Sequence, residues 1–172
     1  MKLTHFFIIL LLFSVSLFVF LQPGSYAKNS DENIAQIEIE DFSIYELNKI
    51  GVKSVLSGTI GRQFSTHYEV ENAHYVENKK DLSEHLYADI GRFKKNIAYL
   101  DENVRYFRED GLSFESDHAI YNMKKESLFV PEKFILTQHE NIIYGQKLRY
   151  FAKSGKISAK KVDANYYLED TK

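Results

Sequence analysis

The chain has 172 residues, a formal net charge of −2, no cysteine, and an aromatic content of 15%. The near-neutral charge argues against a nucleic-acid-binding protein, which usually carries a strong basic excess. The absence of cysteine excludes disulfides, thiolate chemistry and cysteine-ligated zinc, and the many aromatic residues favour β-strands.

The N-terminus begins with a long apolar run, "LTHFFIILLLFSVSLFVFL", over residues 3–21. At ~1.5 Å per residue, a helix of this length spans the ~30 Å hydrocarbon core of a bilayer. Because Lys2 precedes the run, we expect the N-terminus to stay cytoplasmic and the rest to be exported. Cleavage at "SYA" (25–27) is the alternative, although the run is longer than the ~7–15 apolar residues of a signal peptide. We therefore expect a transmembrane anchor over residues 1–24 and a linker over residues 25–35.

The residues after the linker alternate between apolar and polar side chains, which predicts strands. In "IAQIEIEDF" the alternation places Ile37 and Ile39 on one face. In the next stretch it places Phe64 and Tyr68 on one face, and the phase slips by one residue before Ala73. Such a slip predicts a β-bulge at that point.

Residues 81–107 carry a conflicting signal. From Leu82 to Phe107 the apolar residues recur at spacings of three and four, which is the helical period. Against a helix stand Gly91 in the middle of the segment and the turn-like "LDEN" near its end. Periodicity alone favours a helix here.

Turn signals divide the second half of the chain at short intervals. "EDG", "MKKE", "HEN" and "KSG" separate strand-like runs of about ten residues, which predicts a meander of antiparallel strands. Pro131 lacks a backbone N–H, so its strand is expected at a sheet edge or to be bulged there.

A short unit, alanine two residues before tyrosine, recurs along the chain. It occurs at Ala73, Ala119 and Ala164, with looser copies in "IGRF" and "KLRY". We expect each hairpin to offer one apolar face, on which a small residue beside a large aromatic lets neighbouring layers interdigitate.

The segments "DGLSFESDHAIY" and "IYGQKLRYFAKSGKISAKKVDANY", with the strands between them, resemble the periplasmic lipopolysaccharide-transport proteins. The predicted N-terminal span favours the membrane-anchored LptC family over its soluble LptA-type relatives. The resemblance implies an all-β fold, an open, twisted β-jelly roll of antiparallel strands over residues 36–170. It also implies strands, and not a helix, over residues 81–107.

The resemblance further implies a function at the inner membrane. An LptC-type protein accepts lipopolysaccharide from the permease subunits of an inner-membrane ABC transporter. It then passes the lipid to a soluble bridge protein of the LptA type. The lipid A acyl chains are expected in an apolar groove formed by inward-facing residues, for which we predict Phe64, Tyr68, Ile90, Tyr99, Phe114, Leu128, Val130, Phe134, Ile142, Tyr144, Leu148 and Val162.

Partners are expected at the two edge strands, where unpaired backbone groups allow strand addition. The edge residues are Ile37, Ile39 and Phe42 in the first strand and Ile157, Ala159, Val162, Ala164 and Tyr166 in the last. Residues 145–161 contain six basic and no acidic side chains. From these we predict a basic face, Lys147, Arg149 and Lys153, for lipid phosphates or an acidic partner edge.

Catalytic and metal-binding motifs are missing from the sequence. It contains no HExxH, no GxSxG and no glycine-rich phosphate loop, so we expect neither an enzyme nor a metal or cofactor site. Two alternative functions stay open. One is a structural adaptor that joins partners by strand addition without holding lipid, and the other is a secreted, soluble lipid-binding domain.

Overall fold

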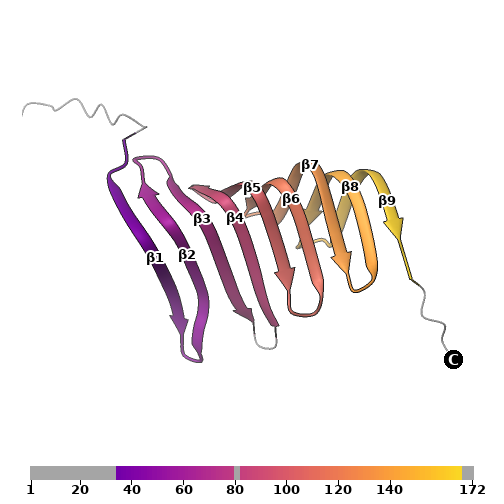
Figure 1. Cartoon of the computed structure of the whole chain (residues 1–172), viewed down its shortest axis with the longest axis horizontal. Coiled ribbons are helices and arrows are strands. Elements are labelled where there is room, and N and C mark those ends of the chain that lie inside the picture. The colour runs from indigo at the N-terminus through magenta and orange to yellow at the C-terminus, as the bar shows by residue number, and fades with distance from the viewer. Residues whose placement is uncertain (1–33, 80–81, 168–172) are drawn as a thin grey trace, which may run out of the picture. The chain divides into compact units, whose positions relative to one another are not determined.

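The computed structural model describes residues 34–79 and 82–167, which form one antiparallel sheet of nine strands. The strands follow one another in chain order, each paired with its sequence neighbours (Figure 1). They are β1 (Ile37–Asn48), β2 (Gly51–Gln63), β3 (Tyr68–Lys79), β4 (Leu82–Lys94), β5 (Ile97–Arg108), β6 (Leu112–Asn122), β7 (Ser127–Gln138), β8 (Asn141–Phe151) and β9 (Lys156–Asn165). The all-β meander expected from the sequence is confirmed.

The expected anchor over residues 1–24 and most of the linker lie outside the described residues. Within residues 34–79 and 82–167, no helix has the length and apolar character needed to cross a membrane.

The helical period over residues 81–107 is misleading, because residues 82–107 lie in the β4–β5 hairpin. The apolar residues that recur at spacings of three and four come from both faces of the sheet. For example, Leu100 is buried in the core, whereas Phe107 is exposed on the opposite face. The turn at Lys95 and Asn96 also resets the phase between the two strands. The predicted "LDEN" turn is wrong, since these residues lie within β5.

Bulges interrupt the strands near their middles. Asn72 and Asn103 have φ values of 48° and 50°, and the registers from β4 to β9 shift at corresponding points. The bulge predicted before Ala73 is confirmed, because Val70 and Ala73 are both buried on one face although three positions apart. The bulge predicted at Pro131 is also confirmed by a register shift between Val130 and Lys133.

The mid-strand bulges lie next to one another in the sheet, and we call the band that they form the crease. The recurring alanine units begin there, because Ala73 and Ala119 directly follow a bulge and are buried. Gly91 and Leu148 begin the looser copies at the same position in β4 and β8. The repeat therefore places small or aliphatic residues at the bend, which agrees with the expected packing. The third copy differs, because Ala164 is exposed on the edge strand β9.

The core lies on one face of the sheet, along the crease. It is built from Ala88, Leu100, Val104, Phe114, Ala119, Val130 and Phe134. Val130 and Val104 are 0% and 1% exposed, although the described residues include no second sheet or helix to cover them. The bulged sheet must therefore curl around this inner face, as bulged strands do; the ribbons of β7 to β9 arch over in Figure 1.

Candidate functional site

The inner face is the face of the sheet that carries the core, and cross-strand pairing arranges its side chains in rows. One continuous row lies on each side of the crease. The row that we call the first wall comprises Ile37, Gln63, Tyr68, Phe93, Ala98, Tyr121, Leu128, Tyr150 and Ile157. The second wall comprises Ile44, Leu56, Tyr75, Leu86, Tyr106, Phe114, Leu136, Ile143 and Ala164.

The walls are less buried than the crease. Phe114 is the only buried residue of the second wall, and the wall becomes open towards the edge, where Ile44 is 55% exposed. Tyr106 lies in the same wall, and burial raises its pKa to about 12. Burial also raises the pKa of Tyr75 and of Tyr121. The inner face thus provides accessible apolar surface along both sides of a filled crease.

A polar rim borders the second wall near the β1–β2 and β3–β4 turns. Lys53 forms an ion pair of 2.8 Å with Glu46, and Lys79 forms one of 2.8 Å with Glu84. The Ser54 hydroxyl donates to Glu46 at 3.0 Å. Paired ionic side chains therefore border the apolar second wall at these turns.

The structure places seven of the twelve predicted groove residues on the inner face. Five of them belong to the core or to one of the walls, namely Phe114, Leu128, Val130, Phe134 and Tyr68. Leu148 packs against the core, and Val162 lies two positions before Ala164 of the second wall. Val130 and Phe134 fill the crease itself, so they contribute packing where the sequence predicted an open groove.

The other five predicted groove residues do not lie on the inner face. Ile90, Tyr99, Ile142 and Tyr144 occupy the outer face, because their neighbours Gly91, Leu100, Ile143 and Gly145 occupy inner positions. Phe64 is in the β2–β3 loop, where its ring stacks on His67 with centroids 4.4 Å apart.

The bulges explain why the predicted faces of these residues are wrong. Each bulge shifts the alternation by one residue, so a face assigned on one side of it is inverted on the other. In β8 the bulge is at Lys147, with φ of 54°.

Both predicted partner edges are unpaired on one side in the described sheet. In β1, Ile37 and Ile39 point to the inner face and are exposed, whereas Phe42 is half-buried over Gly58 and Gly61. In β9 the inner positions are Ile157, Ala159, Val162 and Ala164, and all except the half-buried Ala159 are exposed. Tyr166 lies beyond the end of β9 and is exposed.

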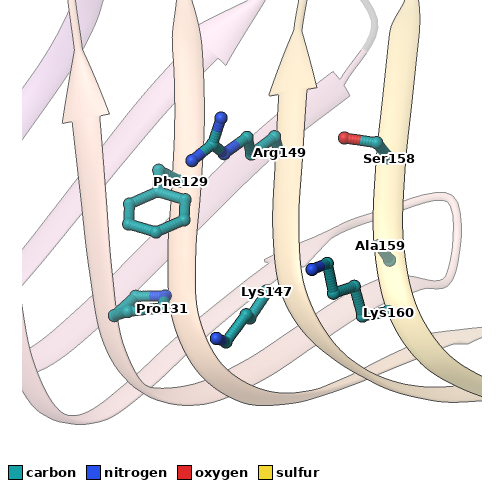
Figure 2. Close-up of a pocket in the computed structure, with 7 residues that line it drawn as sticks. All are labelled: Phe129, Pro131, Lys147, Arg149, Ser158, Ala159 and Lys160. Atoms are coloured by element: carbon teal, nitrogen blue, oxygen red, sulfur yellow. The ribbon is translucent and has the colours of Figure 1, made fainter.

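The predicted basic face is separated into two places. Lys147 and Arg149 line a hollow of about 530 Å³ formed by β7, β8 and β9, and Lys160 joins them there (Figure 2). Lys153 lies in the β8–β9 turn and pairs with Glu126 at 3.4 Å.

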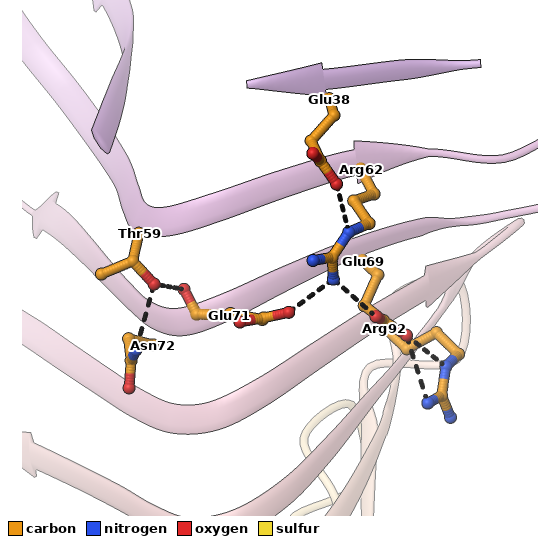
Figure 3. Close-up of polar contacts among 7 residues, drawn as sticks. All are labelled: Glu38, Thr59, Arg62, Glu69, Glu71, Asn72 and Arg92. Carbon is orange, nitrogen blue, oxygen red and sulfur yellow. Dashed lines mark hydrogen bonds and ion pairs between the residues drawn. The ribbon is translucent and has the colours of Figure 1, made fainter. Parts of the chain in front are cut away.

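The outer face carries a ladder of ionic contacts across β1 to β7, which we call the charge ladder. Arg62 contacts Glu38 at 2.6 Å and also reaches Glu71 and Glu69 (Figure 3). Arg92 continues the series, with Glu69 at 3.3 Å and Asp101 at 3.8 Å. These contacts hold the pKa of the Arg62 guanidinium above its usual value.

In β6 the charge ladder includes a histidine, which connects β5 with β7. His118 Nδ1 lies 2.9 Å from Asp101, and its Nε2 lies 4.0 Å from Glu132. The hydrogen bond to Asp101 raises the pKa of His118.

A second outer-face group consists of stacked rings across β3, β4 and β5. His74 Nε2 lies 3.3 Å from His85 Nδ1, and His74 stacks on Tyr87 at 4.1 Å between centroids. His85 stacks on Phe107 at 4.7 Å. Burial, together with the neighbouring His85, lowers the pKa of His74.

Sequence reasoning missed most of the second wall. Leu56, Leu86, Tyr106, Leu136 and Ile143 belong to it, and none was predicted as a groove residue. The hairpin turns carried the information needed to find these residues. Residues that are equally distant from a turn pair across the two strands that it joins, so the turns indicate which side chains form a row. Lys160 was missed because only the pairing of β9 with β8 places it beside Lys147 and Arg149.

The sequence matches no model of a known protein family and no curated protein.

Proposed function

We propose that this protein is a lipopolysaccharide carrier of the LptC type, which binds lipid A acyl chains along the walls of its inner face. The observation that carries the proposal is the second wall, an unbroken row of nine apolar side chains, one from each strand. Such a row offers a continuous apolar track across the sheet.

The energetics of the walls suit acyl chains. Removing apolar surface from water contributes about 25 cal/mol per Å², or ~0.8 kcal/mol for each buried CH₂ group. The walls retain accessible apolar surface. An acyl chain that lies on them would therefore bury apolar surface of the wall and of the chain itself. The filled crease limits how deep a chain can enter, which places it against the walls.

The open edges support transfer between proteins. An unpaired edge strand normally carries a risk of aggregation, because its free backbone groups can pair with another chain. The same groups allow a specific partner strand to add to the sheet. If a neighbour's sheet continues from β1 or β9, its inner face extends the apolar track. In this proposal β1 receives lipid from the transporter permeases and β9 delivers it to an LptA-type protein.

The proposal includes a location. An anchor over residues 1–24 would hold the domain at the inner membrane, with the sheet in the periplasm. Support for it comes from the sequence, namely the apolar run and the preceding Lys2. The open, twisted β-jelly roll of the family requires one sheet that curls around an apolar face, and the bulged meander has these features.

A structural adaptor without bound lipid is the second candidate. The observation that favours it is the filled crease, where Val130 and Phe134 leave no room for a chain. In that case the exposed apolar residues of β1 and β9 serve partner strands alone.

Two adjacent residues of β1 distinguish these candidates. Ile44 points inward and Tyr45 outward, and they are similarly exposed, at 55% and 60%. We expect Ile44→Asp to weaken the binding of lipopolysaccharide to the full chain in neutral detergent about tenfold or more. Tyr45→Asp is the matched control and should leave the affinity unchanged. Equal affinities for both variants and the wild type would reject the carrier and favour the adaptor.

A further inference from the structure

The hollow between β7, β8 and β9 presents three cationic side chains, those of Lys147, Arg149 and Lys160. Figure 2 shows the Arg149 side chain beside the ring of Phe129, with Lys147 on the same strand as Arg149 and with Lys160 and Ser158 on β9. Every charged group that lines the hollow is basic, and its volume of about 530 Å³ is within the range of small-molecule sites.

These cations differ from the three paired arginines of the sheet. Elsewhere in the described residues, Arg62, Arg92 and Arg108 each contact a carboxylate. No carboxylate in the part of the chain that the structure describes forms an ion pair with any of the three cations of the hollow. Cations gathered without a counter-charge repel one another, and a bound anion removes that repulsion.

The fold positions the side chain of one of these cations and the backbone of a second. The guanidinium carbon of Arg149 lies 5.1 Å from the centre of the Phe129 ring, which is a cation–π distance. Lys147 is fixed in the left-handed backbone region by the β8 bulge, with φ of 54°. The Arg149 guanidinium therefore has a defined place in the hollow, and the bulge in β8 sets the point from which the Lys147 side chain starts.

We propose that this hollow binds a phosphoryl group, carried as a phosphomonoester dianion. Two ammonium groups supply point charges, and the guanidinium supplies a fork of N–H donors that matches phosphate oxygens. The Ser158 hydroxyl adds a neutral donor. A single carboxylate carries one negative charge and leaves two of the three cations uncompensated, so a dianion fits the charge better.

The phosphoryl site goes beyond the proposed function and is separate from it. Phe129, Arg149 and Ser158 lie on the outer face, opposite the walls, as their alternation with Val130, Leu148 and Ala159 shows. The phosphoryl group can belong to a lipid headgroup or to a soluble small molecule. These two sources share the same chemistry and are separated by experiment.

The test uses the full chain in a neutral detergent and isothermal titration calorimetry. One arm titrates glucose 1-phosphate, a soluble phosphomonoester. The other arm titrates micelles that contain phosphatidic acid, with phosphatidylcholine micelles as the blank. We compare the wild type with Lys147→Gln/Arg149→Gln and with the single variant Lys160→Gln, which alters only an exposed side chain of an edge strand. The matched control is Lys124→Gln/Lys125→Gln, which removes two charges from the β6–β7 turn.

We expect the double variant to weaken phosphomonoester binding about tenfold or more, the scale of one charge-assisted hydrogen bond. Lys160→Gln should weaken it less, and the control pair should not change it. Binding in the glucose 1-phosphate arm supports a soluble ligand, and binding only in the phosphatidic acid arm supports a lipid headgroup. Absence of binding in both arms, or equal weakening by the control pair, would overturn the proposal. Ile44→Asp should leave phosphomonoester binding intact, so failure of the wall proposal and failure of this one are distinguishable.

Discussion

Val130 and Val162 are both valines and lie on the same face of one sheet, yet their side chains differ in exposure. Val130 is 0% exposed, whereas Val162 is 55% exposed. Val130 lies in the crease, where strands flank it on both sides and the curled sheet covers it. Val162 lies on β9, which has a neighbour on one side only. In this sheet, therefore, an apolar side chain in the crease of a central strand stabilises the fold, whereas the same side chain on an edge strand remains available to a ligand or partner.

The largest expected effect tests the packed centre. Phe134 is 4% exposed and contacts the Phe114 ring, with centroids 6.2 Å apart. We expect Phe134→Ala to lower the free energy of unfolding by about 3–5 kcal/mol, measured by urea denaturation. The edge control Ile157→Ala changes a residue that is 64% exposed and should stay within about 0.5 kcal/mol. Similar losses for both variants would show that centre and edge are not distinct.

A smaller loss of stability is expected from a substitution at Gly145, the glycine against which the Phe134 ring packs. A Cβ atom at Gly145 would lie 2.5 Å from the Phe134 ring, too close for any real contact. We expect Gly145→Ala to destabilise the protein by about 1–3 kcal/mol through overpacking, measured by the same denaturation. Gly91→Ala is the control, because its new Cβ would be 3.4 Å from its nearest neighbour. A stable Gly145→Ala variant would contradict the packing of the crease.

The two edges themselves differ on the outer face. Glu38 ties β1 to β2 through Arg62, whereas no ion pair joins β9 to β8 within the described residues. We expect backbone amides of β1 to exchange hydrogen more slowly than those of β9. Arg62→Gln should speed exchange in β1, and salt should reduce this effect, because exposed ion pairs are screened. Arg149→Gln, which breaks no ion pair, should leave exchange in β1 unchanged, and a salt-independent effect of Arg62→Gln would argue against the charge ladder.

The smallest expected effects are pH-dependent and have opposite signs. Asp101 raises the folded-state pKa of His118. The stability from this contact is therefore fully present below the unfolded value of ~6.5 and is lost as pH rises through the folded pKa. Burial lowers the folded-state pKa of His74, so its contribution is present above ~6.5 and is lost as pH falls through the folded pKa.

Unfolding measured from about pH 5 to 8 separates the two histidines, since the unperturbed imidazole pKa lies in this window and the two pKa values are shifted in opposite directions. His118→Gln should remove the loss on the alkaline side, and His74→Gln should remove the loss on the acidic side. Unchanged pH profiles would show that neither contact contributes to stability.

Local chemistry made the strands and turns predictable. The turn signals after β5, β6, β7 and β8 lie where the structure turns, because glycine, asparagine and charged residues interrupt the alternation. Pro131 and the phase slip before Ala73 located two bulges. The faces of Tyr99 and Tyr144 were not predictable in the same way, because one undetected bulge inverts every assignment beyond it.

The walls and the hollow depend on long-range register. Ile44 and Ala164 are 120 positions apart in the chain, and only the sum of eight pairings places them in one row. The sequence pattern identified Tyr75 and Tyr121 as repeating units, but it gave no account of the rows that they form. The separation of Lys153 from Lys147 and Arg149 likewise follows from the end of β8 at Phe151.

The most direct test of the proposed carrier is site-specific photo-crosslinking of the full chain in cells that make lipopolysaccharide. The probe would replace Ile44 and Val162 on the inner face, with the adjacent outer-face residues Tyr45 and Asp163 as controls. If the inner face holds acyl chains, lipopolysaccharide adducts form at Ile44 and Val162 and not at the controls. Adducts at the controls alone, or at no position in a folded protein, would contradict a lipid-binding inner face.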